Sequence, residues 1–130
     1  MELCGNKTLS QFCRTRPGKK LSSDEAKMVF LQIVHGVKYI HDSGFAHRDL
    51  KLTNILIDYN NTVKIIDFGF ACDGNTTERM YCGTPSYMPP EIVERKSYEP
   101  KPVDLWSIGV VLFKLLTGTY AFGCKVLNKI

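Results

Sequence analysis

The segment from about Pro102 to Thr117 is apolar on nearly every side, and it constrains the fold more than any other part of the chain. Pro102 near its first position and Gly118 after its end are typical helix boundaries. A helix of this kind requires cover from other elements on every side. A chain of 130 residues, the size of one domain or a piece of one, can form a core, but whether its remaining elements supply that cover is a separate question. Its apolar residues are Val103, Leu105, Trp106, Ile108, Val110, Val111, Leu112, Phe113, Leu115 and Leu116.

A second helix is predicted from Ser22 to about Ser43. Ser22 and Glu25 have the spacing of a capping box, and Gly44 suits the position after the helix end. Upstream, the basic run 14–20 contains Pro and Gly, and we expect it to be a solvated loop. Apolar residues repeat at steps of three and four, which predicts an amphipathic helix: Ala26, Val29, Phe30, Ile33, Val34, Val37 and Ile40.

Two short β-like runs, 54–57 and 63–66, follow this helix. The residues between them, 58–62, are rich in turn formers, so the sequence predicts a hairpin. From Asp67 to Glu91 glycines, threonines and prolines alternate with no sustained period. A stretch this long without regular structure is usually functional or disordered. The predicted fold class is mainly α with a small β-hairpin (α+β).

Composition excludes several classes of protein. Seventeen Lys and Arg against thirteen Asp and Glu leave a net charge of +4, too weak to indicate nucleic acid or a membrane surface as a partner. The five cysteines are odd in number and contain no C-x-x-C pair, so neither a disulfide framework nor a zinc site is indicated. The longest apolar run, 108–113, is too short to cross a bilayer, and the start resembles no signal peptide. We expect a reduced, cytoplasmic or nuclear setting.

Chemically active residues gather around the predicted hairpin. Asp49, Lys51 and Asn54 precede it, and Asp67 follows it directly. Carboxylate and amide oxygens are ligands suited to Mg²⁺, and a lysine can balance phosphate charge. A second carboxylate five positions before the amide could accept a proton from an attacking hydroxyl. The pattern indicates a site for a polyphosphate with a divalent metal; a surface aspartate beside a capped turn is the less specific alternative.

The segments His47-Arg48-Asp49-Leu50-Lys51-Leu52-Thr53-Asn54 and Asp67-Phe68-Gly69 resemble the catalytic and metal loops of eukaryotic protein kinases. The resemblance implies that Asp49 orients the substrate hydroxyl and takes its proton, and that Lys51 steadies the transferring phosphoryl group. It also implies that Asn54 and Asp67 hold Mg²⁺, with ATP as the phosphoryl donor.

Residues 82–91 resemble the end of a kinase activation segment, with Pro89 where the family usually has alanine. Residues 104–109 are similar to the start of the family's buried central helix, whose aspartate braces the catalytic loop. The first four residues resemble the hinge, where the Glu2 carbonyl and Cys4 amide would meet adenine with Leu56 beneath it. A plain chain start and a core leucine explain the same residues equally well.

The presence of Lys51 and Thr84 at these positions resembles the pattern of serine/threonine kinases. The sequence of residues 82–88 resembles that of the calcium/calmodulin- and AMP-regulated group of kinases. Arg48 before the catalytic aspartate is the arrangement that receives an activating phosphate. The position two before Cys82, where this group commonly carries its phosphothreonine, is Met80. Thr76 and Thr77 are the nearest substitutes, and Glu91 holds the place of the glutamate that pairs with a later arginine.

The resemblance covers 1–130 but only about the middle half of a kinase domain. No G-x-G-x-x-G and no lysine-bearing Val-Ala-Ile-Lys strand occurs in the sequence. We therefore expect a partial C-lobe without the N-lobe or the last helices, whose parent phosphorylates protein Ser/Thr hydroxyls and which is inactive alone. The alternatives are a non-catalytic, pseudokinase-like module or gene remnant, and, third, an independent enzyme. Uncovered apolar surface on the 102–117 helix would aggregate or bind a partner.

Overall fold

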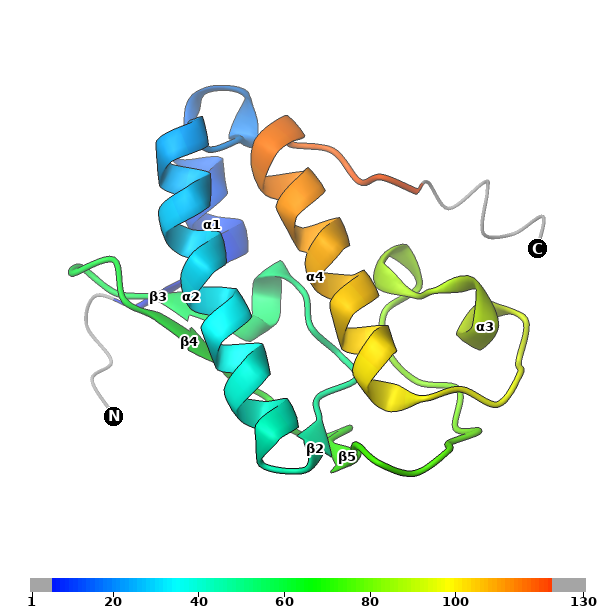
Figure 1. Cartoon of the computed structure of the whole chain (residues 1–130). Coiled ribbons are helices and arrows are strands. Elements are labelled where there is room, and N and C mark those ends of the chain that lie inside the picture. The colour runs from blue at the N-terminus through cyan, green and yellow to red at the C-terminus, as the bar shows by residue number, and fades with distance from the viewer. Residues whose placement is uncertain (1–5, 123–130) are drawn as a thin grey trace.

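The computed structural model describes residues 6–122, which form a mainly helical fold with two small antiparallel sheets (Figure 1). The predicted hairpin is present, and the structure adds short strands on either side of it. Glu2 and Cys4, which the sequence predicts to meet adenine, lie outside the described residues. The helices are α1 (Leu9–Arg14), α2 (Ser23–Asp42), α3 (Pro90–Val93) and α4 (Pro100–Thr117), and the strands are β1 (Lys7–Thr8), β2 (Phe45–Ala46), β3 (Ile55–Ile57), β4 (Val63–Ile65) and β5 (Cys72–Asp73).

Helix α2 begins and ends where its sequence predicts. Ser22 Oγ accepts a hydrogen bond from the Glu25 amide at 3.2 Å, and the Glu25 carboxylate reaches back to the Ser22 amide, which completes the capping box. After Asp42, Ser43 caps the helix and Gly44 takes a left-handed φ of 89°. One face of the helix is buried through Ala26, Val29, Ile33 and Val37.

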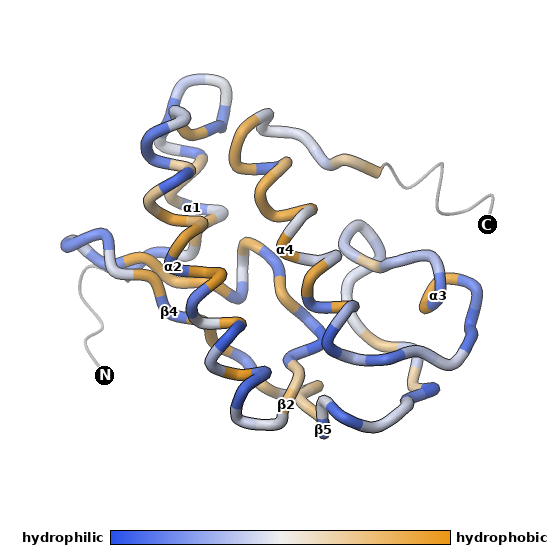
Figure 2. The backbone as a smooth tube through the Cα atoms, viewed as in Figure 1, coloured by the Kyte–Doolittle hydropathy of each residue, from blue (hydrophilic) through white to orange (hydrophobic). Residues whose placement is uncertain are grey.

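Helix α4 starts at Pro100, two residues before the predicted Pro102, and ends before Gly118, whose φ is 77°. The helix is not covered on every side within the described residues, since Leu105, Phe113 and Leu116 remain 57%, 42% and 41% exposed. The elements of residues 6–122 cover only one side of the helix. The other side is the uncovered apolar surface that the sequence led us to expect. Figure 2 shows α4 orange along most of its length, whereas α2 alternates between orange and blue.

Helices α2 and α4 lie side by side and form the centre of the core (Figure 1). The three-stranded sheet, in the order β1-β3-β4, packs against α2. The second sheet, β2-β5, pairs Phe45 with Asp73 and Ala46 with Cys72. Because β2 also contacts α4, the chain that leaves α2 passes directly along the start of α4. Leu9, Ile33, Ile55, Val111 and Leu115 are among the fully buried side chains of this core.

The basic run 14–20 is mostly exposed, as expected, but it is also anchored to the rest of the fold. Arg16 binds Glu25 at 2.7 Å and stacks on Phe12, and a 3₁₀ turn covers Pro17–Lys19. The backbone of this loop also lies against the end of α4: a Cβ at Gly118 would come within 2.5 Å of the Gly18 carbonyl oxygen. Glycine at 118 is therefore required both by its φ and by this close approach.

The stretch 67–91 is largely irregular, as predicted. It contains β5, a 3₁₀ turn at Pro85–Tyr87 and the start of α3. A backbone bridge between Glu78 and Tyr98 ties its middle to the segment before α4. Within residues 6–122 the cysteines Cys13, Cys72 and Cys82 are free thiols. None of the helices in this part of the chain is long and apolar enough to cross a membrane.

The ion pair between Arg16 and Glu25 predicts a pH-dependent stability. Hydrogen bonds from Arg16 lower the pKa of Glu25, so the pair stabilises the fold above the unfolded value of about 4.3 and is lost as pH falls through the lowered pKa. Glu25→Gln keeps a side chain that can cap Ser22 but removes the charge. We expect it to lower the free energy of unfolding at pH 7 by about 0.5–1 kcal/mol, since both side chains are partly exposed.

Urea denaturation at pH 7 and pH 3.5 measures this effect. Asp24→Asn, in the same helical turn but without an ion pair within the described residues, is the matched control and should change the free energy by less than about 0.3 kcal/mol. A Glu25→Gln deficit that persists unchanged at pH 3.5 would show that the charge is not its cause.

Candidate active site

The Asp49 carboxylate is the centre of a compact polar cluster. Its Oδ1 accepts a hydrogen bond from Thr84 Oγ1 at 3.1 Å, and its Oδ2 lies 3.3 Å from Asn54 Nδ2 and 3.8 Å from Lys51 Nζ. Lys51 Nζ in turn donates to Thr84 Oγ1 at 2.9 Å. The Asp49 side chain is 10% exposed, so it is positioned by these contacts yet remains reachable. The structure brings together four residues that the sequence singled out from two distant segments.

Asn54 and Asp67 are brought close by the hairpin. Asn54 ends a 3₁₀ turn (Leu52–Asn54) that leads into β3, and its carbonyl accepts a hydrogen bond from the Ile66 amide at 2.9 Å. Asp67 is the next residue, is exposed, and has a left-handed φ of 61°. Its Oδ1 accepts from the Gly69 amide at 3.3 Å. Each residue therefore presents an oxygen-bearing side chain at the same end of the two strands.

These side chains fit a hard cation. Asn54 donates through Nδ2 to the Asp49 carbonyl at 2.8 Å, which leaves its amide oxygen free of hydrogen bonds from the described residues. Asp67 likewise keeps one carboxylate oxygen unused within this part of the chain. An amide and a carboxylate oxygen are ligands suited to Mg²⁺, which keeps several waters and takes one or two protein ligands plus phosphate oxygens.

His47 connects the two loops that carry these residues. It is fully buried; its Nδ1 accepts a hydrogen bond from the Asp49 amide at 3.1 Å, and its Nε2 lies 2.9 Å from the Ile66 carbonyl oxygen. Because a carbonyl can only accept, Nε2 carries the proton. Its ring also contacts the edge of Phe68, with centroids 4.9 Å apart. One imidazole thus fixes the distance between the Asp49 loop and the Asp67 loop.

Asp104 of α4 holds the same loop from below. Its two carboxylate oxygens accept hydrogen bonds from the amides of His47 and Arg48, both at 2.8 Å, and His41 Nε2 lies 2.8 Å from Oδ2. Asp104 is fully buried. Arg48 has a left-handed φ of 71°, a conformation costing about 1–3 kcal/mol for a residue other than glycine. The carboxylate stabilises this backbone, as the resemblance led us to expect.

Arg48 points its guanidinium toward the irregular stretch 67–91 and Tyr98 rather than toward solvent. Nε donates to the Phe70 carbonyl at 2.7 Å, one terminal nitrogen donates to the Tyr98 hydroxyl at 3.1 Å, and the other lies 3.9 Å from the Met80 sulfur. The Tyr98 hydroxyl donates to the Met80 carbonyl at 2.6 Å. Burial raises the pKa of Tyr98 to about 12, so the hydroxyl keeps its proton at neutral pH.

The remaining predicted residues are distributed around this centre. Leu56 lies on the opposite face of β3 from the buried Ile55 and Ile57 and is half-buried, which suits a surface beneath a planar ring. Thr76 and Thr77 are exposed, and no hydrogen bond joins either of them to Asp49. The Thr76 hydroxyl donates to the Asp73 carbonyl and to the Glu78 carboxylate. Glu91, in α3, has a carboxylate without an ion-pair partner among residues 6–122.

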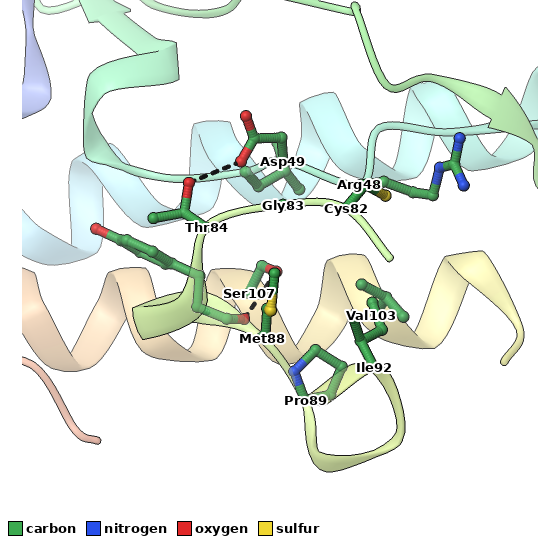
Figure 3. Close-up of a pocket in the computed structure, with 12 residues that line it drawn as sticks. Arg48, Asp49, Cys82, Gly83, Thr84, Met88, Pro89, Ile92, Val103 and Ser107 are labelled. Atoms are coloured by element: carbon green, nitrogen blue, oxygen red, sulfur yellow. Dashed lines mark hydrogen bonds between the residues drawn. The ribbon is translucent and has the colours of Figure 1, made fainter. Parts of the chain in front are cut away.

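A small cavity lies between the Asp49 loop, residues 82–92 and α4. Figure 3 shows Asp49 and Thr84 joined across its upper edge, with Pro89, Ile92 and Val103 on its lower side. Ser107 of α4 donates to the Tyr87 carbonyl at 3.3 Å and so fixes the floor.

The sequence did not single out some residues on which the site depends. His41 and Tyr98 lie in a helix and a linker with no motif around them, and Tyr87 lies within the recognised run 82–91 without a predicted role of its own. His47 belonged to the recognised motif, but its bridging role follows only from the distance to Ile66. The His41 ring and the His47 amide meet at the same Asp104 carboxylate oxygen, Oδ2, although they lie six positions apart in the sequence.

Comparison with known proteins identifies the family. A family model described as the protein kinase domain matches residues 1–129. The chain is 42% identical over 94% of its length to the hormonally up-regulated neu tumor-associated kinase homolog B of Xenopus laevis, covering 20% of that protein. It is 40% identical to the human hormonally up-regulated neu tumor-associated kinase, covering 17% of it, and 44% identical over 80% of its length to a putative serine/threonine-protein kinase of Saccharomyces cerevisiae, covering 12%. The chain spans about a fifth or less of these relatives' length.

The chain therefore belongs to the protein kinase domain family. Membership agrees with the geometry, because the matched segment contains the Asp49, Asn54 and Asp67 side chains at the end of one hairpin. The names of the relatives include serine/threonine-protein kinases, as the resemblance of the sequence implied.

The triple acceptor role of Asp104 predicts a large loss of stability when it is altered. In Asp104→Asn the amide NH₂ replaces one acceptor and faces a buried N–H donor, which leaves polar groups unpaired. We expect the free energy of unfolding to fall by about 2–4 kcal/mol, measured by urea denaturation. Asp58→Asn is the control: asparagine can still accept from the Asn60 and Thr62 amides, so the loss should stay below about 0.5 kcal/mol. Equal losses would refute a special role for Asp104.

Removing the Tyr98 hydroxyl should increase local opening of the backbone around Met80. Tyr98→Phe leaves the Met80 carbonyl without its donor and one Arg48 N–H without its acceptor, at a cost of about 1–3 kcal/mol. Amide hydrogen exchange of residues 78–82 should quicken accordingly. Tyr81→Phe is the control, since its ring stays beneath Arg95 at 3.8 Å. Unchanged exchange in Tyr98→Phe would contradict the anchoring role.

The same variant carries a pH signature. Since the raised pKa of Tyr98 lies near 12 in the fold and about 10 when unfolded, its contribution is complete below pH 10 and is lost as pH rises through 12. The free energy of unfolding of Tyr98→Phe should fall less steeply across that range than that of the unaltered chain. Parallel curves would show that Tyr98 does not titrate with the fold.

Proposed function

We propose that this chain is part of the C-lobe of a serine/threonine protein kinase catalytic domain, and that its site directs the γ-phosphate of ATP to protein hydroxyls. The observation that carries the proposal is the contact network of Asp49 with Thr84, Lys51 and Asn54, at the end of the hairpin that also presents Asp67. A base, a cation and two oxygen ligands within one cluster suit phosphoryl transfer better than any other reaction.

Each residue has a separate task in this mechanism. ATP supplies the phosphoryl group and Mg²⁺ offsets its charge, with Asn54 and Asp67 as the residues that would hold the metal. The Asp49 carboxylate accepts the proton of a serine or threonine hydroxyl as the new oxygen–phosphorus bond forms and the bond to the ADP oxygen breaks. Lys51 provides positive charge beside the Asp49 carboxylate, 3.8 Å away, where the transferring group would pass.

Thr84 holds the side chains of Asp49 and Lys51 in fixed positions relative to each other. Its hydroxyl accepts from Lys51 Nζ and donates to Asp49 Oδ1, so one side chain of the activation segment connects both groups. Positioning supplies most of the rate of phosphoryl transfer, which makes this contact part of the proposed machinery.

We further propose that the 130-residue chain transfers phosphate slowly, if at all, without additional protein. The sequence contains no glycine-rich loop and no Val-Ala-Ile-Lys strand to hold the phosphates from above. Leu56 then has nothing in the described structure to sandwich a base, and a wet site weakens electrostatic stabilisation.

A non-catalytic binding module is the second candidate, and the exposed side of α4 favours it. Leu105, Phe113 and Leu116 form an uncovered apolar surface that a partner could bury. In that case the Asp49 cluster would be a remnant, and substitutions there would leave the module's binding unchanged.

Two substitutions test the proposed roles. They are made in the 130-residue chain and in a chimaera in which the part of the Xenopus laevis relative that precedes the matched segment is joined to it. In the chimaera, Asp49→Asn and Asp67→Asn should each reduce phosphate transfer to a mixed protein substrate by about 10²–10⁴-fold, since a base or a metal ligand is lost. Asp73→Asn, an exposed aspartate outside the cluster, should leave the rate within twofold.

Near-normal turnover in the Asp49→Asn chimaera would refute its role as base. Transfer by the 130-residue chain at the chimaera's rate, abolished by Asp67→Asn, would refute the proposal that the chain needs additional protein. A folded chimaera with no activity would favour the binding module.

A further inference from the structure

A second cavity lies beside the active-site loop, on the side of the basic run 14–20. It has a volume of about 200 Å³, and its lining includes Arg14, Lys19, Leu52, Lys114 and Tyr120. Three of these side chains are cationic and come from three separate segments: the end of α1, the 3₁₀ turn and the last turn of α4. None of the residues that line it is acidic.

The charges in this cavity are not neutralised by the surrounding protein. Arg14, Lys19 and Lys114 form no ion pair within residues 6–122, and the nearby Glu25 is already bound to Arg16. Burial raises the pKa of Cys13, which also lines the cavity, so its thiol stays neutral and adds no negative charge.

The fold holds these like charges together. The close approach of Gly118 to the Gly18 carbonyl fixes the loop that carries Lys19 against the end of α4 that carries Lys114. Lys114 Nζ donates to the Gly118 carbonyl at 3.2 Å and lies 3.9 Å from the centre of the Tyr120 ring. An ammonium group has three N–H donors, so Lys114 keeps donors for a ligand.

The cavity adjoins the active-site loop through two residues. Leu52 lines it and lies three positions after Asp49, so their Cα atoms are at most about 11 Å apart. Tyr120 packs on Tyr87 with ring centroids 5.6 Å apart, and the Tyr87 hydroxyl accepts from the Leu52 amide at 3.5 Å. A peptide in extended form advances about 3.3 Å per residue, so this upper limit corresponds to about three residues of a bound peptide between the cavity and a hydroxyl at Asp49.

From this arrangement we infer that the cavity of Arg14, Lys19 and Lys114 selects protein substrates with an anionic side chain, carboxylate or phosphate, about three residues from the accepting serine or threonine. The inference rests on the proposed function, whose substrate class it narrows. Cations that form no ion pair within residues 6–122 and line a cavity near the reactive residue are suited to an anionic neighbour of the reacting group.

Peptide binding tests the inference without requiring catalysis. Fluorescently labelled 13-residue peptides carry one serine and, three positions before or after it, glutamate, phosphoserine, glutamine or lysine. Their affinities for the 130-residue chain are measured by fluorescence anisotropy. We expect the glutamate peptide, in at least one of the two positions, to bind about fivefold or more tightly than its glutamine counterpart, and the lysine peptide to bind weakest. If the phosphoserine peptide binds more tightly than the glutamate peptide, phosphate is the preferred anion. If these two peptides bind equally, negative charge alone determines the preference. Both results support the inference.

Charge reversal identifies the residues responsible. Lys19→Glu, at an exposed loop position, and Lys114→Glu should each abolish the preference for glutamate. Lys27→Glu changes the net charge equally on the exposed face of α2 and should retain the preference. Equal binding of the glutamate and glutamine peptides in both positions by the folded chain would overturn the inference. Loss of the preference in Lys27→Glu to the same degree as in Lys19→Glu would also overturn it, since net charge alone would then explain binding.

Phosphate transfer by the chimaera to the same peptides separates the two proposals. A KM about fivefold lower for the glutamate peptide supports both. Selective binding of the anionic peptides without transfer to any of them would refute the proposed function and leave the anion-binding cavity standing. Transfer with equal KM for glutamate and glutamine peptides would refute the selectivity alone.

Discussion

The buried carboxylate of Asp104 is the interaction on which the remainder of the site depends. It accepts hydrogen bonds from two consecutive amides of the active-site loop and lies within hydrogen-bond distance of His41. A charged group without solvent contact is stable only when its lone pairs are used, so carboxylate and loop require each other. The left-handed backbone conformation of Arg48 is maintained because the Asp104 carboxylate accepts the hydrogen bond of the Arg48 amide. Through that one residue, α4 sets the position of Asp49.

From this fixed loop, contacts extend to both neighbouring segments. The His47 ring donates to the Ile66 carbonyl and so positions the neighbouring Asp67. Arg48 donates to the Tyr98 hydroxyl, which in turn donates to the Met80 carbonyl. The guanidinium is therefore already engaged by neutral groups of the chain. The segment that ends in Thr84 is held in contact with Asp49 by side chains that carry no phosphate.

Much of this could be predicted from the sequence where the signal is local. The capping box of Ser22 and Glu25 fixed one end of α2, and the turn-rich residues 58–62 located the hairpin. Short strands such as β2 and β5 could not be predicted, because two residues carry no periodicity and their pairing depends on the tertiary fold. The cluster around Asp49 was predicted by its motif, whereas Tyr98 was not, since its hydroxyl acts on a backbone carbonyl 18 positions away. The anchoring of the basic run 14–20 could not be predicted for the same reason: composition indicates an exposed loop, whereas its contact with Gly118 depends on the docking of α4.

The span between Asp104 and the amides that it holds has a consequence for the order in which the chain folds. His47 and Asp104 are 57 positions apart, so the loop that carries Asp49 gains the acceptor for two of its backbone amides only after α4 has been synthesised and has docked. Local elements such as α2 and the hairpin can form early, because their contacts are close in sequence. During synthesis the ribosome therefore releases a helix and a hairpin joined by an unformed loop, whose apolar residues are exposed until α4 arrives. Chaperone demand for this chain should be greatest in that interval, before a single distant side chain closes the site.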